Sequence, residues 1–182
     1  MCTPSQDAEP VRPPPGLAAV PTTVAPQVNK LPDNHVLSEL LRDAPDRSVL
    51  RWLAKQPTDG LFVAALTQAE MMLGAHLFPA GKQRTALESA LRAMFDEDFA
   101  GRPLPFGSAA ATAFVEIVAF RPASVRPISQ INAQIAEIAR RDAVSVATRN
   151  VDDFSECGIA VLHPWLPPLT QLRPARPLRR SR

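Results

Sequence analysis

Apolar side chains recur every three or four positions in several segments of the chain, which is the spacing of one face of a helix. Ile131, Ile135 and Ile138 share such a face, with small alanines between them. Asp46 stands just before another periodic stretch, where it is expected to cap the helix N-terminus. The pattern predicts helices over residues 36–45, 46–56, 67–78, 81–98, 108–120 and 128–141.

Shorter apolar runs without a helical period lie between these helices. The runs 61–66 (LFVAAL), 143–148 (AVSVAT) and 159–165 (IAVLHPW) predict strands, and the first suits a strand covered on both faces. Residues 102–106 (RPLPF) form a short strand at best, because their two prolines exclude them from the centre of a sheet. Strands that alternate with helices predict an α/β fold: a short parallel sheet with helices on both faces.

The two ends of the chain differ in composition from its middle. The first 30 residues hold seven prolines and little that can pack, so they cannot bury enough apolar surface to offset the entropy of ordering. The last residues are also proline-rich and carry five arginines. We therefore expect a disordered extension over 1–27, one folded domain over 28–166, and a flexible basic tail over 167–182.

Length and composition limit the class of protein. The 182 residues are 46% apolar, which suits one globular domain, and the two cysteines cannot make a disulfide framework. The N-terminal segment lacks the basic start and apolar run of a secretory signal, and the most apolar helix is too short to cross a membrane. We therefore expect a cytoplasmic protein without a membrane span. The net charge is only +2, so an acidic substrate would need local arginines or a metal to hold it.

Polar residues follow the strands at the points where ligands gather in parallel sheets. Thr67 and Glu70 come after 61–66, and on this segment alone a capping box is the favoured interpretation, although Glu70 also starts an inward-leaning stripe. Residues 150–154 (NVDDF) follow 143–148, and their simplest interpretation is a turn whose Asn and Asp side chains cap a short helix.

Two further polar positions belong to the same pattern. Asp33 and Asn34 precede the first helix as a candidate N-cap, although the strand before them is poor because Pro32 removes a ladder donor. Asn132 stacks over Ile135 on its helix, so a polar amide stands on the face that turns inward. Each position has a local explanation, but four such junctions in one α/β domain can converge on one acidic pocket.

Such a pocket would suit a divalent cation. Crowded carboxylates repel one another, and a hard cation such as Mg²⁺ or Mn²⁺ relieves that repulsion. A cation held in this way can polarise a phosphodiester and activate a water molecule. The three histidines show no ligand spacing, and no strand is followed by a glycine-rich phosphate loop, which argues against a nucleotide-binding regulatory module.

Four segments carry a resemblance to a known family, in the same order along the chain. They are LPDNHVLSEL, TQAEMMLG, PISQINAQIAEIAR and ATRNVDDF, the last followed by GIAVLHPW. They resemble LDTNVLSEL, TxAEhxxG (h apolar), PIsxxDAQIAAIAR and ATRNxxDF of the PIN-domain ribonucleases, specifically the VapC and FitB toxins of bacterial toxin–antitoxin pairs. The resemblance covers about residues 31–165, which is essentially the whole predicted domain.

The resemblance implies a three-layer α/β/α sandwich, a Mg²⁺ or Mn²⁺ cofactor, an RNA substrate, a cognate antitoxin and a homodimer. By position, Asp33 and Glu70 match the family's metal-binding aspartate and glutamate. Asn132 stands where the family has a third metal-binding aspartate. Asn150 and Asp153 match the last motif, which completes the acidic pocket and positions water or metal.

This chain departs from the family pattern at two places. Asn132 offers a neutral carbonyl oxygen where an aspartate offers charged ones, and Asn34-His35 replaces the usual Thr-Asn after a strand that Pro32 is expected to break. Two hypotheses therefore stay open. The chain is a metal-dependent ribonuclease toxin, active or weakened, or it is a degenerate PIN protein that binds an antitoxin or RNA without cleavage.

Overall fold

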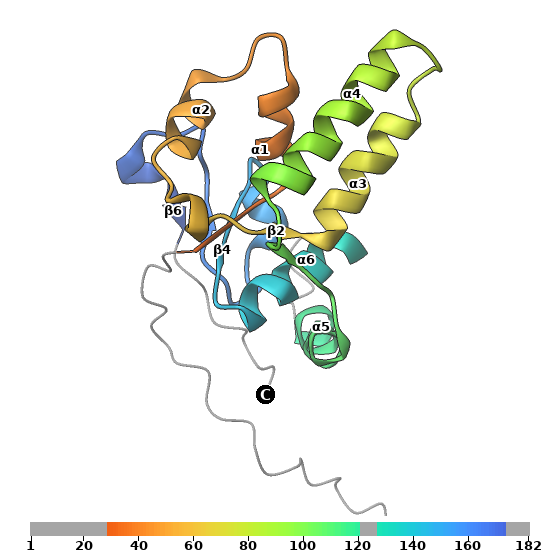
Figure 1. Ribbon diagram of the computed structural model, residues 1–182. Coiled ribbons are helices and arrows are strands. Elements are labelled where there is room, and N and C mark those ends of the chain that lie inside the picture. Colours follow the sequence, from red (N-terminus) through yellow and green to blue (C-terminus); the bar gives the residue numbers. More distant parts are fainter. Residues whose placement is uncertain (1–28, 121–126, 174–182) are drawn as a thin grey trace, which may run out of the picture.

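The computed structural model describes residues 29–120 and 127–173 (Figure 1). Their helices are α1 (Asn34–Ser38), α2 (Arg47–Leu53), α3 (Ala65–His76), α4 (Lys82–Ala93), α5 (Ser108–Phe120) and α6 (Gln130–Arg141). Short 3-10 turns are η1 (Glu39–Leu41), η2 (Thr58–Gly60), η4 (Val151–Phe154) and η5 (Pro168–Thr170), and a π-helical turn, η3 (Met94–Asp98), extends α4. Each of the six predicted helices is found, although the first, predicted to reach residue 45, ends with η1 at Leu41. The Asp46 side chain caps α2 by accepting the Ser48 N–H at 2.7 Å.

The strands are short and mostly parallel. β1 (Lys30–Pro32), β4 (Ser145–Ala147) and β5 (Val161–Leu162) run parallel, and β6 (Leu172–Arg173) pairs antiparallel with β5. β2 (Val63–Ala64) and β3 (Pro103–Leu104) form a second parallel pair. A bridge between Lys30 and Leu61 joins the two sheets, so their strands end at a shared carboxyl edge.

Side chains alternate across this sheet and pack into three apolar clusters, one on one face and two on the other. On one face, Leu31, Val146 and Val161 pack with apolar residues of α5 and α6. On the other face, Val63 packs with α1, α3 and α4, whereas Ala147 and Leu162 pack with α1 and α2. Figure 1 shows α5 and α6 on the opposite side of the strands from α1, α2 and α4. The expected three-layer α/β/α fold is therefore confirmed.

The prediction for residues 61–70 was wrong in one respect. The strand ends at Ala64, and α3 already begins at Ala65, with no side chain capping its N-terminus. Thr67 lies inside the helix and is fully buried, so the capping box with Glu70 does not form. Burial of the first turn of α3 against the sheet fixes the start of this helix, which leaves Glu70 free for another role.

Pro32 does not break its strand, contrary to the sequence expectation. The Asn29 carbonyl accepts the Ser145 N–H, and the Asp33 N–H donates to the Ala147 carbonyl, so the backbone N–H and C=O groups of odd-numbered residues face β4. The Lys30 carbonyl instead accepts the Phe62 N–H on the other side of the strand. Pro32 has the orientation of Lys30, and its missing N–H therefore lies away from the β4 ladder. The strand reaches Asp33 intact.

The boundary expected at 166 was also wrong, because the start of the predicted tail packs on the domain. His163 donates its N–H to Gln171 at 2.9 Å, and β6 covers β5. The expectations for 1–27 and for 174–182 lie outside the described residues. Within the part of the chain that the structure describes, no helix is long and apolar enough to cross a membrane.

Candidate active site at the carboxyl edge of the sheet

Asp33 leaves the end of β1 and is almost fully buried, with 6% of its surface exposed. One carboxylate oxygen, Oδ1, accepts from the Val36 N–H at 3.0 Å and so caps α1, as the local interpretation expected. The other, Oδ2, accepts from the Thr148 hydroxyl at 2.6 Å and lies 3.0 Å from His35 Nδ1. Asp33 is therefore a capping residue and also the most firmly oriented carboxylate at this edge.

Thr148 is a site residue that the sequence analysis missed. It directly follows β4, is fully buried, and its hydroxyl also accepts the Asn150 N–H at 2.9 Å. The Thr148 hydroxyl therefore fixes both the Asp33 side chain and the backbone of Asn150. The signal was present in the sequence, because a hydroxyl residue ends a buried strand immediately before a polar turn.

Glu70 lies on the second turn of α3, within electrostatic reach of Asp33. Burial raises the pKa of Glu70, the negative charge of Asp33 raises it further, and the charge of His35 opposes the rise. The pKa of His35 is itself raised, chiefly by its hydrogen bond to Asp33. Two carboxylates thus share a partly desolvated corner, and the imidazole of His35, which contacts Asp33, is a source of positive charge beside them.

Asn132 and Asp153 form a second pair. Ser129 caps α6 by accepting the Asn132 N–H at 3.1 Å, and the Asn132 side chain donates from Nδ2 to Asp153 Oδ2 at 3.3 Å. The amide is therefore directed toward the turn that follows β4, as its place on the inward face predicted. The helix α6 contacts both η4 and α3, so it connects this pair to the Glu70 side of the edge.

Asn150 contributes its backbone to the site, whereas the sequence predicted that its side chain would cap a short helix. Its side chain is exposed and makes no capping hydrogen bond to η4, so that interpretation was wrong for this residue. Its backbone N–H binds Thr148 and its carbonyl accepts the Asp153 N–H at 3.1 Å. Asn150 therefore ties the position of Asp153 to the hydroxyl that orients Asp33.

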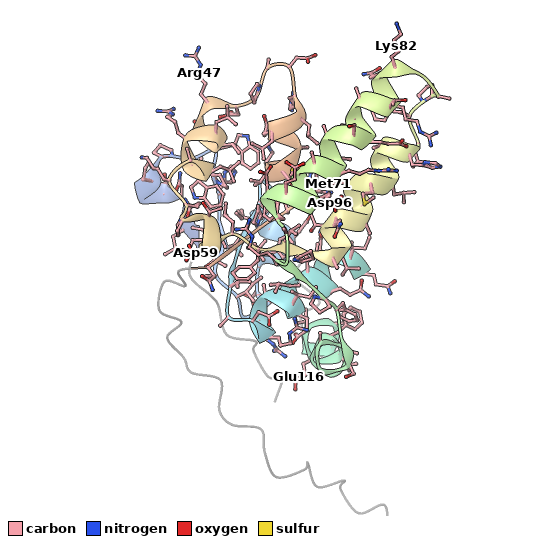
Figure 2. All side chains as sticks on the ribbon, viewed as in Figure 1. Arg47, Asp59, Met71, Lys82, Asp96 and Glu116 are labelled. Atoms are coloured by element: carbon pink, nitrogen blue, oxygen red, sulfur yellow. The ribbon has the colours of Figure 1, made fainter. Side chains whose placement is uncertain are left out.

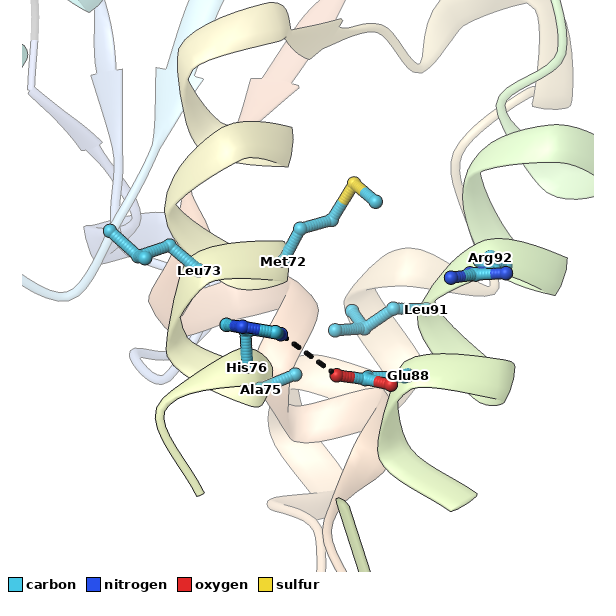
Figure 3. A pocket seen from close by; sticks show the side chains of 7 residues that line it. All are labelled: Met72, Leu73, Ala75, His76, Glu88, Leu91 and Arg92. Atoms are coloured by element: carbon cyan, nitrogen blue, oxygen red, sulfur yellow. Dashed lines mark hydrogen bonds and ion pairs between the residues drawn. The ribbon is translucent and has the colours of Figure 1, made fainter. Parts of the chain in front are cut away.

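Two of the cavities lined by described residues lie along α3. One, with a volume of 430 Å³, is lined by His35 and Glu70 and continues over apolar side chains such as Met71 and Leu87 between α1, α3 and α4. The other measures 330 Å³ and lies further along the hairpin, where Met72 and Leu91 face each other and His76 Nδ1 lies 3.3 Å from Glu88 (Figure 3). Only the first opens beside the predicted site residues.

Comparisons with known proteins agree with this geometry. No protein-family model matches the chain. Over 135 residues it is 35% identical to the VapC ribonuclease Y4jK of Sinorhizobium fredii, which covers 74% of this chain and 96% of that protein. The chain belongs to the VapC/FitB family of PIN-domain toxins. It is also 33% identical over 133 residues to toxin FitB of Neisseria gonorrhoeae, with 73% of this chain and 96% of FitB covered.

Solved structures of the VapC/FitB family show the same fold. The FitAcB structure from Neisseria gonorrhoeae aligns with a TM-score of 0.71 and 32% identity, over 75% of this chain and 98% of that chain. The VapBC2 structure from Rickettsia felis, bound to a promoter DNA fragment, aligns with a TM-score of 0.55 at 16% identity, which supports the fold alone.

The donor atoms at this edge suit the hard divalent cation that the VapC/FitB resemblance implies. Glu70 and Asp33 bring carboxylate charges close enough to raise the pKa of Glu70, which is the repulsion that a cation relieves. The site is not a complete acidic cage, however. Within residues 29–120 and 127–173, no three His, Cys, Asp or Glu side chains form a group that could hold a metal ion, and the position of the family's third aspartate is held by Asn132.

Proposed function

We propose that this chain is a VapC/FitB-like ribonuclease toxin that cleaves RNA phosphodiester bonds with Mg²⁺ or Mn²⁺ in the cytoplasm. The observation that carries the proposal is the buried Asp33, oriented by Thr148 beside the partly desolvated Glu70. A carboxylate held this firmly is unusual for a helix cap alone, because a cap needs one oxygen and here both are fixed.

Asp33, Glu70, Asn132 and Asp153 would hold the cation, and Asn150 would keep the last of them in place. When bound, the cation polarises the phosphodiester and makes a water molecule more acidic. The protein supplies the orientation: the Thr148 hydroxyl and the Val36 amide fix Asp33 before any ligand arrives. Pre-oriented charged groups lose little free energy in reorganisation during the reaction.

A specific observation also favours the second candidate, a degenerate PIN protein that binds without cleaving. The Asn132 amide donates to Asp153 and so occupies one oxygen of a proposed metal ligand. In addition, His35 supplies a positive partner for Asp33 that would compete with a cation. Both features predict weak metal binding in the natural sequence.

The partners in this proposal are a cognate antitoxin and a second copy of the chain. The related solved structures include FitAB bound to a DNA fragment, which aligns with a TM-score of 0.71. Exposed apolar side chains support the need for partners: Leu73 and Leu77 on the α3 side are 58% and 74% exposed, and Val115 on α5 is 61% exposed. Sedimentation of the chain alone tests for the dimer, which a monomer at micromolar concentration would contradict.

The decisive test is cleavage of single-stranded RNA with Mg²⁺ or Mn²⁺, compared with an Asp33→Asn variant. Asparagine retains the helix cap but removes the charge, so loss of activity cannot be attributed to a lost cap. Cleavage by the natural chain that needs metal and Asp33 supports the nuclease. Metal-dependent RNA binding without cleavage supports the degenerate alternative, and equal cleavage by both proteins refutes the site.

A further inference from the structure

Arg149 follows Thr148 at the carboxyl edge of the sheet and is held there by two groups. Its guanidinium carbon lies 4.4 Å from the centre of the Trp165 ring, in the range of a cation–π contact. One guanidinium nitrogen, Nη2, lies 3.4 Å from Glu39 Oε1. Nevertheless, 48% of the side chain is exposed. The guanidinium is therefore restrained on one side and open to solvent on another.

Glu39 is an unusual partner for an exposed arginine, because only 3% of its side chain is accessible. Its Oε2 accepts the Asp46 N–H at 2.8 Å, and its Oε1 lies 3.4 Å from both Arg149 and Arg42. One buried carboxylate thus faces two guanidinium groups. Two of these three groups are cationic and one is anionic, and the buried anion fixes where the guanidinium charges lie.

This rim adjoins the candidate active site. Arg149 directly follows Thr148, whose hydroxyl donates to Asp33 at 2.6 Å, so the guanidinium projects from the same strand end that orients this carboxylate. Arg42 lines the same cavity as His35 and Glu70. The two arginines therefore stand beside the carboxylates, on the side of α1 and η1.

The chemistry of the substrate gives this arrangement a purpose. Each phosphate of an RNA strand is negatively charged, and the carboxylates of the site repel it. A cation at the scissile phosphate offsets this for one phosphate only, so the neighbouring phosphates need positive groups at the rim. A planar guanidinium stacked on an aromatic ring has edge N–H groups suited to bidentate contact with a phosphate.

We propose that Arg149 binds a phosphate of the RNA strand next to the scissile one, with Arg42 as a second contact. Glu39 and Trp165 act as positioning residues, which hold the Arg149 guanidinium in the plane that meets the strand. This inference rests on the proposed function for its substrate class, but it concerns binding and can be tested without cleavage.

The test is the salt dependence of RNA binding. A fluorescein-labelled single-stranded RNA of mixed sequence is titrated with the natural chain and with Arg149→Gln, without divalent metal, between 50 mM and 300 mM KCl. Loss of one phosphate contact should reduce the slope of log affinity against log salt by about 0.7, which corresponds to about 3.5-fold in affinity across the range from 50 mM to 300 mM KCl. Arg149→Lys should keep the slope and lose part of the affinity, because lysine retains the charge but not the planar fork.

Lys82→Gln is the matched control, since it removes the same charge from the tip of the α3–α4 hairpin, far from the sheet edge (Figure 2). A slope reduced by Arg149→Gln but not by Lys82→Gln supports the proposal, and the Arg42→Gln/Arg149→Gln pair should reduce it by about 1.4. A purely structural role would lower the thermal stability of Arg149→Gln and leave its slope unchanged, which would overturn the inference.

The outcomes separate this inference from the proposed function. RNA binding with an unchanged slope in Arg149→Gln rejects the role of Arg149, while metal-dependent cleavage by the natural chain still supports the nuclease. A reduced slope in a chain that never cleaves RNA retains the role of Arg149 and points to the binding-only alternative. No RNA binding by the natural chain in this metal-free titration overturns the role of Arg149, while the cleavage assay with Mg²⁺ or Mn²⁺ still decides the proposed function.

Discussion

Replacing Thr148 with valine should weaken the fold and the candidate site together. Valine has nearly the shape of threonine, so the substitution removes the hydroxyl and leaves the packing of this fully buried position almost unchanged. The hydroxyl donates to Asp33 at 2.6 Å and accepts the Asn150 N–H at 2.9 Å. Both contacts are lost in Thr148→Val.

The expected loss of stability depends on the charge and exposure of the two hydrogen-bond partners of the hydroxyl, the Asp33 carboxylate and the Asn150 N–H. A hydrogen bond to a charged, buried group contributes about 1.5–3 kcal/mol. The Asn150 backbone lies at an exposed position, where water can replace the hydroxyl, so its contribution is smaller. We expect the free energy of unfolding to fall by about 2–3 kcal/mol, which lowers the melting temperature by about 4–12 °C for a domain of this size.

Thr67 provides a matched control within the same domain. It is also fully buried, but its hydroxyl has no hydrogen-bond partner among the described residues. Thr67→Val should therefore be neutral or stabilising, because it removes an unsatisfied polar group. The assay is urea unfolding of the natural chain and both variants, combined with RNA cleavage, which should fall about tenfold or more only in Thr148→Val. Equal stability of Thr148→Val and the natural chain would refute the argument that this hydroxyl orients Asp33.

Three further predictions follow from buried or crowded carboxyl groups and from the ends of the chain. Asn132→Asp places a carboxylate against Asp153, so the free energy of unfolding of the metal-free variant should fall by on the order of 1–2 kcal/mol and be restored by Mn²⁺. Thermal-shift titration tests this, and equal Mn²⁺ affinity in the variant and the natural chain would show that position 132 holds no metal. Burial raises the pKa of Glu137 to about 7, although Arg140 Nε lies 3.2 Å from its Oε2. The folded state therefore binds the proton more tightly than the unfolded state, and the free energy of unfolding should fall as the pH rises from about 4.5 to about 7. Glu137→Gln should remove this slope and gain up to about 3 kcal/mol at pH 8 but nothing at pH 4; unfolding curves with the same pH dependence in both proteins would contradict it. Limited proteolysis should remove residues 1–27 and the end of the chain beyond β6 while the core resists; a trimmed chain that fails to fold would reject these boundaries.

The local patterns of the sequence were sufficient for the helices and for most of the layering. The stripe of Ile131, Ile135 and Ile138 predicted α6, and burial of that stripe needs no information beyond the period. The direction in which Asn132 points followed from the same period. The family motifs added the names of the site residues, whose metal binding and catalytic roles stay predictions.

Contacts between distant segments decided what the local patterns could not. Thr67 looks like a helix cap when its neighbours are read alone, but packing of α3 on the sheet begins the helix two residues earlier. Pro32 looks like a strand breaker, but which neighbour its missing N–H would face depends on the pairing of β1 with β4. The spacing of apolar residues along one segment cannot predict where α3 begins or which neighbour Pro32 faces.

What the sequence alone determined about this protein is therefore its helices and most of its strands, its α/β class and the identity of the acidic and amide residues at the strand ends. Only the tertiary structure decided how these residues meet: Thr148 on Asp33, 115 positions apart in the chain, and Arg149 on Glu39, 110 positions apart. The physical reason is that periodicity reports which face of a segment is buried, whereas a hydrogen bond between two segments depends on strand register and helix position, which are set when the whole core packs.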